Sequence, residues 1–158
     1  MLSRAMVRRL PVLQNPDTDD AAAARRPRWH WVLIGAGFVI TLFLPLSQLG
    51  VWVGSFLTRN AEGTVGTARI VLGAGPVAFS FLLACGLAGT LVGRFGGKAQ
   101  APEAALSGVI GSALVWALAA VGGALTPWPV AVFSLVVLVV FGGGAAFVGA
   151  RLGLARRV

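Results

Sequence analysis

Charged side chains are scarce in this chain of 158 residues, where they make up 11% of the sequence. A soluble domain carries about 25% charged residues, so this chain has too few of them to cover a surface that faces water. Hydrophobic residues make up 57%, and the mean hydropathy is +0.86. The composition therefore argues against a soluble globular protein and favours one whose surroundings are lipid.

Residues that commonly carry out chemistry are also rare. Cys85 is the only cysteine, so the chain can form neither an internal disulfide nor a cysteine cluster for a metal. His30 is the only histidine, and its place between two tryptophans favours anchoring at a membrane interface over metal binding or base catalysis. None of the five acidic residues lies inside an expected membrane span. We therefore expect no metal site, no cofactor and no enzymatic activity.

Long uncharged runs dominate the rest of the sequence. Residues 29–58 and 70–93 lie between arginines, and residues 104–150 form one longer run that the sequence TPWP at 126–129 divides. Proline ends a helix by removing a backbone donor and clashing with the preceding turn. The expected spans lie near 31–53, 70–93, 105–125 and 129–151, each close to the ~20 residues that cross a bilayer core of ~30 Å.

This pattern predicts an all-α integral membrane protein, a four-helix bundle made of two helical hairpins. A soluble bundle of buried helices is the competing fold, but it needs polar outer faces that these runs lack. Residues 29–158 would form the four-span transmembrane domain. Residues 1–28 are polar and carry charges of both signs, which is typical of a disordered or interfacial basic tail. The first apolar run begins too late for a signal peptide.

The basic residues predict the orientation of the chain. With four spans, residues 1–28, the loop after residue 93 and the carboxyl tail share one side of the membrane and hold eleven arginines and lysines, while the other side holds only Arg59 and Arg69. Positively charged segments remain in the cytoplasm, so we expect both termini there. Arginine outnumbers lysine twelve to one, a bias that suggests a bacterial protein and hence the bacterial inner membrane.

A glycine cluster, VVFGGGAAFVGAR at 139–151, resembles a dinucleotide-binding turn at first sight. Gly142 and Gly144 fit the first two positions of G-x-G-x-x-G, but Phe147 stands at the third. That motif also needs an acidic residue about 20 positions downstream, and none follows Glu103. The cluster therefore does not predict a nucleotide cofactor.

Small residues four positions apart recur in every expected span. They allow two helix backbones to approach closely, which is how helices associate in lipid. From this spacing we predict a helix-packing interface that consists of Gly89, Gly93, Gly97, Gly108, Ser112, Gly142, Ala146 and Ala150. Gly50 and Gly54 add a pair in the first span, and Gly149 and Gly153 lie beside the small-residue face of the fourth. The spacing leaves open whether these faces meet within one chain or between chains.

Three further residues are candidates for other contacts. Arg94 and Arg151 end the second and fourth spans, where they would bind lipid head groups or an acidic partner, or serve only as orientation signals. Pro45 is expected to kink the first helix. Gln48, three residues later, would line a cavity at that kink or form a hydrogen bond with a neighbouring helix.

Two segments of the sequence resemble each other. Both begin with Pro-Val-Ala, at Pro76 and at Pro129, and both become rich in glycine before an arginine. A duplication of one helical hairpin explains this similarity, and so does a shared composition, and the sequence does not distinguish the two.

The sequence favours an interaction protein: a small accessory, structural or regulatory subunit that packs with other membrane helices. Its expected partners are the lipid bilayer and other membrane subunits or a second copy of itself. Ion-coupled transport needs an ionisable residue within the membrane, and the expected spans contain none. The alternative is an uncoupled channel or facilitator for a small solute, formed by one chain or by several copies of it. An integral membrane enzyme that acts on lipid is the third hypothesis. Nucleic acid is not expected, because the basic residues form no face interleaved with aromatics.

Overall fold

The computed structural model describes residues 29–61, 66–97, 99–123 and 128–156. These residues form four helices: α2 (Trp29–Asn60), α3 (Thr67–Phe95), α4 (Ala101–Val121) and α5 (Trp128–Ala155). All four are long and apolar enough to cross a membrane. For the described residues, the predicted all-helical fold with membrane-length helices is confirmed. The expected tail, residues 1–28, lies outside the described part of the chain.

The helix ends differ from the expected spans. α2 runs to Asn60, beyond the expected end at 53, and continues through Pro45 as one helix. Its 32 residues correspond to ~48 Å, which exceeds a bilayer core of ~30 Å. α4 begins at Ala101, where the Glu103 carboxylate accepts a hydrogen bond of 3.0 Å from the Gln100 backbone N–H.

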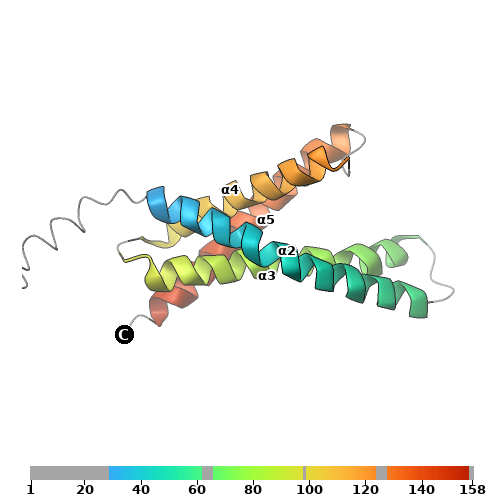
Figure 1. Ribbon diagram of the computed structural model, residues 1–158, viewed down its shortest axis with the longest axis horizontal. Helices are drawn as coiled ribbons and strands as arrows, with labels where there is room; N and C mark the ends of the chain where they lie inside the picture. The colour runs from blue at the N-terminus through green and yellow to red at the C-terminus, as the bar shows by residue number, and fades with distance from the viewer. Residues whose placement is uncertain (1–28, 62–65, 98, 124–127, 157–158) are drawn as a thin grey trace, which may run out of the picture.

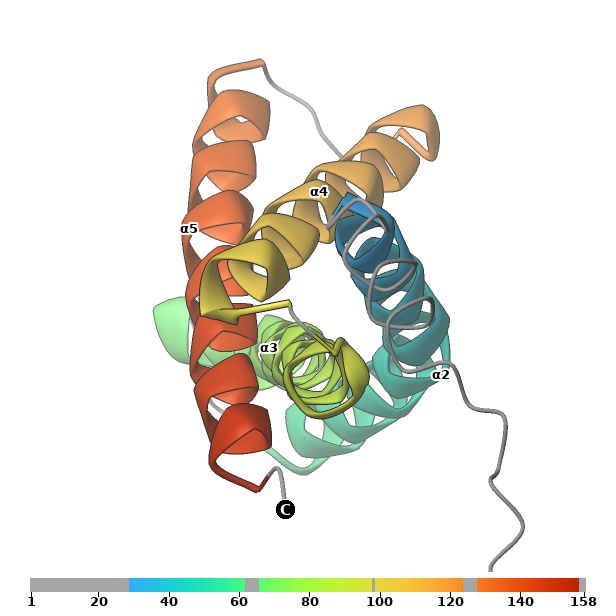
Figure 2. The same ribbon diagram turned by 90° about the vertical axis from the view of Figure 1, so that its left-hand side faces the viewer.

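The helices pair as two antiparallel hairpins, α2 with α3 and α4 with α5 (Figure 1). Across the hairpins, α3 packs against α5 and α2 packs against α4, and a smaller contact joins α3 to α4. The described residues of α2 and α5 do not touch. Figure 2, which looks along the bundle, shows α2 and α5 on opposite sides with α3 and α4 between them.

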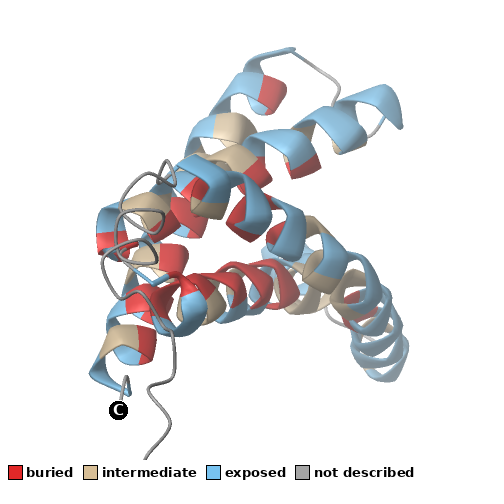
Figure 3. Cartoon of the chain, turned by 60° about the vertical axis from the view of Figure 1, so that its left-hand side comes forward, coloured by how far each residue is buried: buried red, intermediate tan, exposed pale blue. Residues whose placement is uncertain are grey.

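The two ends of the molecule differ in shape. The start of α2, the α3–α4 connection and the end of α5 lie together at one end, which we call the tail end. The hairpins diverge toward the other end, which we call the splayed end (Figure 1). Buried residues gather near the tail end and the middle, whereas the diverging arms are largely exposed (Figure 3).

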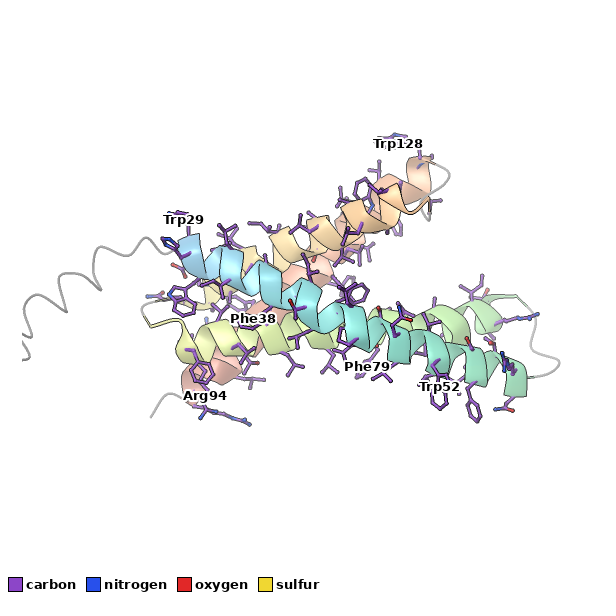
Figure 4. The ribbon with its side chains drawn as sticks, viewed as in Figure 1. Trp29, Phe38, Trp52, Phe79, Arg94 and Trp128 are labelled. Carbon is purple, nitrogen blue, oxygen red and sulfur yellow. The ribbon has the colours of Figure 1, made fainter. Side chains whose placement is uncertain are left out.

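Apart from Phe81, the buried side chains of the described residues are small or medium-sized, and many large apolar side chains are exposed. One core cluster consists of Val39, Phe81, Cys85, Ala88 and Val115, and a second, nearer the tail end, consists of Val92, Ala99, Ala101, Ala104 and Ala150. Phe79, Trp52 and Trp128 are 67%, 70% and 73% exposed (Figure 4). Large exposed apolar surfaces mark contact with lipid or protein partners, so this distribution supports a multi-pass membrane protein.

Candidate functional site: the helix crossings

The closest approach between the two hairpins lies where α3 crosses α5. Gly89 and Gly93 of α3 face the backbone of Ala146 and Ala150 of α5. A side-chain carbon placed on Gly89 would lie 2.7 Å from the Ala146 Cα atom, and one on Gly93 would lie 2.8 Å from the Ala150 Cα atom. Real side-chain carbons essentially never approach so closely, so only glycine fits at these two positions.

The same arrangement is repeated from the other side of this crossing. Gly149 and Gly153 of α5 face the backbone of Gly86 and Thr90 of α3, and a side-chain carbon on Gly149 would lie 2.9 Å from the Gly86 carbonyl carbon. Each helix therefore offers a G-x-x-x-G pair to small residues of the other. The crossing has a local two-fold relation between parallel helices, as in other small-residue contacts in membranes.

A second close contact joins α4 to α5 within their hairpin. A side-chain carbon on Gly108 would lie 2.6 Å from the Gly142 carbonyl oxygen and 2.7 Å from the Ala146 Cβ atom. One on Gly142 would collide with the Ser112 Oγ atom and lie 3.0 Å from a ring carbon of Phe81. The Ser112 hydroxyl donates a hydrogen bond of 2.6 Å to the Gly108 carbonyl oxygen. Gly142 and Ala146 thus occupy the space where α3, α4 and α5 meet.

A third contact joins α2 to α4, and sequence reasoning missed it. A side-chain carbon on Gly35 would lie 2.6 Å from the Ser107 Cβ atom, and one on Gly111 would lie 2.8 Å from the Val39 Cβ atom. Ser107 and Gly111 are four residues apart, a spacing that the sequence does show. Val39 is not a small residue, so the matching face of α2 carries no comparable signal.

Seven of the eight predicted packing residues lie at contacts between helices of the same chain, and Gly97 does not. Gly89, Gly93, Gly108, Ser112, Gly142, Ala146 and Ala150 are all buried at the contacts described above. Gly97 lies beyond the end of α3, with a φ of 57° in the turn that follows, and is exposed. Gly149 and Gly153 complete the α3–α5 crossing. In the sequence they show the same spacing of four residues as the other packing residues.

The sequence similarity between the hairpins does not coincide with their spatial relation. At the α3–α5 crossing Gly89 corresponds to Gly149, an offset of 60 residues, whereas Pro76 and Pro129 are 53 residues apart. The contact between α3 and α4 also has no counterpart between the described residues of α2 and α5. The two-fold relation is therefore local to the crossing.

Among the residues that the structure describes, the buried polar side chains are Ser80, Ser107 and Ser112. Each donates a hydrogen bond of 2.6 to 2.8 Å to a carbonyl oxygen of its own helix. In the described part of the chain, no buried side-chain nitrogen or oxygen lacks a hydrogen bond. The same residues contain no cluster of three metal-binding side chains.

The three other candidate residues are exposed. Gln48 lies in a groove of about 430 Å³ lined by α2 alone, beside Trp52, Ser55 and Arg59, rather than between helices. Arg94 and Arg151 lie toward the tail end (Figure 4 labels Arg94). Their guanidinium carbons are 5.6 Å and 5.2 Å from the ring centres of Phe95 and Phe147, respectively.

The chain matches no known family model, no curated protein and no solved structure. Its function therefore has to be inferred from its own residues.

Proposed function

We propose that this protein is an accessory subunit, structural or regulatory, that packs with other membrane helices in the bacterial inner membrane, with both termini in the cytoplasm. One observation carries the proposal. The small residues that bring helices together are used inside the chain, while large apolar side chains remain exposed on all four helices.

The diverging arms offer the most surface to a partner. In α4 no residue after Val115 is buried, and in α5 Ala131 is the only buried residue before Gly142. Phe133 is 71% exposed on this arm, and Phe79 is 67% exposed on the other. Aromatic side chains are enriched at protein interfaces, so these arms suit contact with further helices.

The channel alternative has less support from the described residues. A path for a polar solute needs polar groups that are free to replace its hydration. The three buried serines donate their protons to carbonyls of their own helices. Gln48 faces outward from α2. A pore would therefore have to form between copies of the chain.

Site-specific photocrosslinking in native membranes tests the proposal. A photoreactive residue replaces one exposed side chain on each helix: Leu44, Phe79, Leu114 or Phe133. We expect at least one position to give a protein adduct of one discrete mass, while positions on other faces give lipid adducts. The adduct should disappear when a neighbouring exposed residue on that face is changed to aspartate.

Two outcomes would contradict the proposal. One is lipid adducts alone at all four positions, together with recovery of the protein as a single species in several mild detergents. The other is selective solute flux through liposomes that contain only the purified protein, which would establish the channel instead.

A further inference from the structure

A groove runs along the outside of the α3–α5 crossing. It has a volume of about 490 Å³ and lies between residues 82–90 of α3 and 140–152 of α5. Leu83, Leu87, Phe141 and Val148 line it. Thr90 is its one hydroxyl residue, and this hydroxyl donates a hydrogen bond of 2.8 Å to the Gly86 carbonyl oxygen. The groove therefore presents an apolar surface.

The groove has the depth of one bilayer leaflet. Residues 140–152 of α5, which form one wall, rise about 18 Å along the helix. Half of a hydrocarbon core of ~30 Å is about 15 Å. The wall starts at mid-helix and ends at Leu152, close to the tail end. A single acyl chain of the leaflet that faces the tail end fits this position.

Two arginines follow the groove at its tail-end mouth. Arg94 comes four residues after Thr90 and shares a helix face with this lining residue. Arg156 lies in the turn that directly follows the end of α5 at Ala155. A side-chain carbon on Gly153 would lie 3.0 Å from the Arg94 backbone nitrogen, which brings the ends of α3 and α5 together here. The Arg156 backbone N–H donates to the Gly153 carbonyl oxygen at 3.2 Å.

The guanidinium of Arg94 is able to bind an anion. It lies over the ring of Phe95, which is exposed. Stacking occupies the flat face of a guanidinium and leaves its in-plane N–H groups for a phosphate. Both the apolar groove and the cationic mouth therefore point to one ligand class. We propose that the α3–α5 groove binds one acyl chain of an anionic phospholipid, whose phosphate is held by Arg94 and Arg156.

Arg151 supplies a matched control. It carries the same charge at a similar depth, but its guanidinium lies over Phe147. Phe147 packs against the core cluster of Val92, Ala99, Ala101, Ala104 and Ala150 and is not among the residues that line the groove. Neutralising Arg151 therefore changes the net charge as much as neutralising Arg94 does, without changing the mouth.

Gly144 supplies a second test, because it lines the groove and a side-chain carbon there would meet no atom within 4 Å. Gly144→Leu therefore fills the groove without disturbing the helix contacts. Gly37→Leu is its control, since Gly37 of α2 is equally open and lies outside the groove. Both changes also replace glycine with a better helix former.

The experiment uses the full chain in nanodiscs that contain equal amounts of palmitoyl-oleoyl phosphatidylglycerol and palmitoyl-oleoyl phosphatidylcholine. Native mass spectrometry then counts the lipids that the released protein retains. We expect one retained phosphatidylglycerol per chain. Retention should fall about tenfold in Gly144→Leu and about fivefold in Arg94→Gln or Arg156→Gln. It should stay at the wild-type level in Gly37→Leu and Arg151→Gln, and glycerol 3-phosphate should not displace the lipid.

Three outcomes would overturn the inference: unchanged retention in Gly144→Leu, an equal loss in Arg94→Gln and Arg151→Gln, or a protein adduct from a photoreactive residue at position 144. The third would identify the groove as a helix-docking site instead. Lipid binding here does not depend on the proposed subunit function, and neither result decides the other.

Discussion

Glycines of this chain differ sharply in what surrounds them. Gly89 contacts the backbone of another helix, whereas a side-chain carbon on Gly37 of α2 would meet no atom within 4 Å. The sequence predicted the importance of Gly89 and Gly93, because their spacing of four residues matches one helix face. It could not separate Gly97 from them, because the same spacing continues past the residue where α3 ends. The end depends on the Gly96–Gly97 turn, where Gly97 adopts a φ of 57°.

Gly89→Ala should destabilise the fold by about 1 to 3 kcal/mol, because the added methyl group forces two backbones apart. Gly37→Ala should be neutral or stabilising by up to about 1 kcal/mol, because alanine favours helix at an open position. Cys85 is fully buried, so its reaction with a maleimide during graded denaturation measures the unfolding. Equal denaturation midpoints for the two variants would contradict the importance of this crossing.

For the helices, the sequence predicted that each one exists better than it predicted where each one ends. Apolar runs identified all four helices, but the first span was expected to stop at 53 and α2 continues to Asn60. In lipid the backbone must satisfy its own hydrogen bonds, which favours continuous helix. Near Pro45, the hydroxyls of Thr41 and Ser47 donate to the carbonyl oxygens of Gly37 and Leu44. α2 continues through Pro45 without a break. The kink expected at Pro45 stays a prediction.

Trp116 connects α4 to α5 beyond the last buried residue of α4. Its indole N–H donates to the Ala131 carbonyl oxygen at 2.9 Å and lies 3.3 Å from the Ser134 Oγ atom. Trp116→Phe should destabilise the fold by about 0.6 to 1.7 kcal/mol, the range for helix–helix hydrogen bonds in membranes. Trp52→Phe, at a residue that is 70% exposed, should change stability by less than about 0.5 kcal/mol. Urea titrations in mild detergent compare the two, and matching curves would argue against a role for the indole bond.

For the whole molecule, composition predicted the class but not which helices cross between the two hairpins. The four helices are apolar on nearly every face, so periodicity does not show which side is inward. The crossings are set instead by single positions such as Gly35, Gly111 and Gly149. Gly35 and Gly111 lie outside the small-residue pairs that the sequence suggested. Helices pair in lipid where small residues allow their backbones to approach closely, and a pattern of hydrophobicity does not show these positions.

The expected orientation can be tested with single cysteines in a Cys85→Ala background. Asn60→Cys lies at the splayed end, and Ala155→Cys lies at the tail end. In intact cells a membrane-impermeant maleimide should label Asn60→Cys and leave Ala155→Cys unlabelled, because positively charged ends remain in the cytoplasm. Inverted vesicles should reverse this result. Labelling of Ala155→Cys in intact cells would place the termini outside.

The divergence of the two hairpins has a consequence for what surrounds the molecule. The hairpins lie close together at the tail end and apart at the splayed end, so the helices expose more of their surface at the splayed end (Figures 1 and 3). Close contacts set by a few glycines near the tail end therefore leave this protein with a larger boundary to its surroundings at the splayed end.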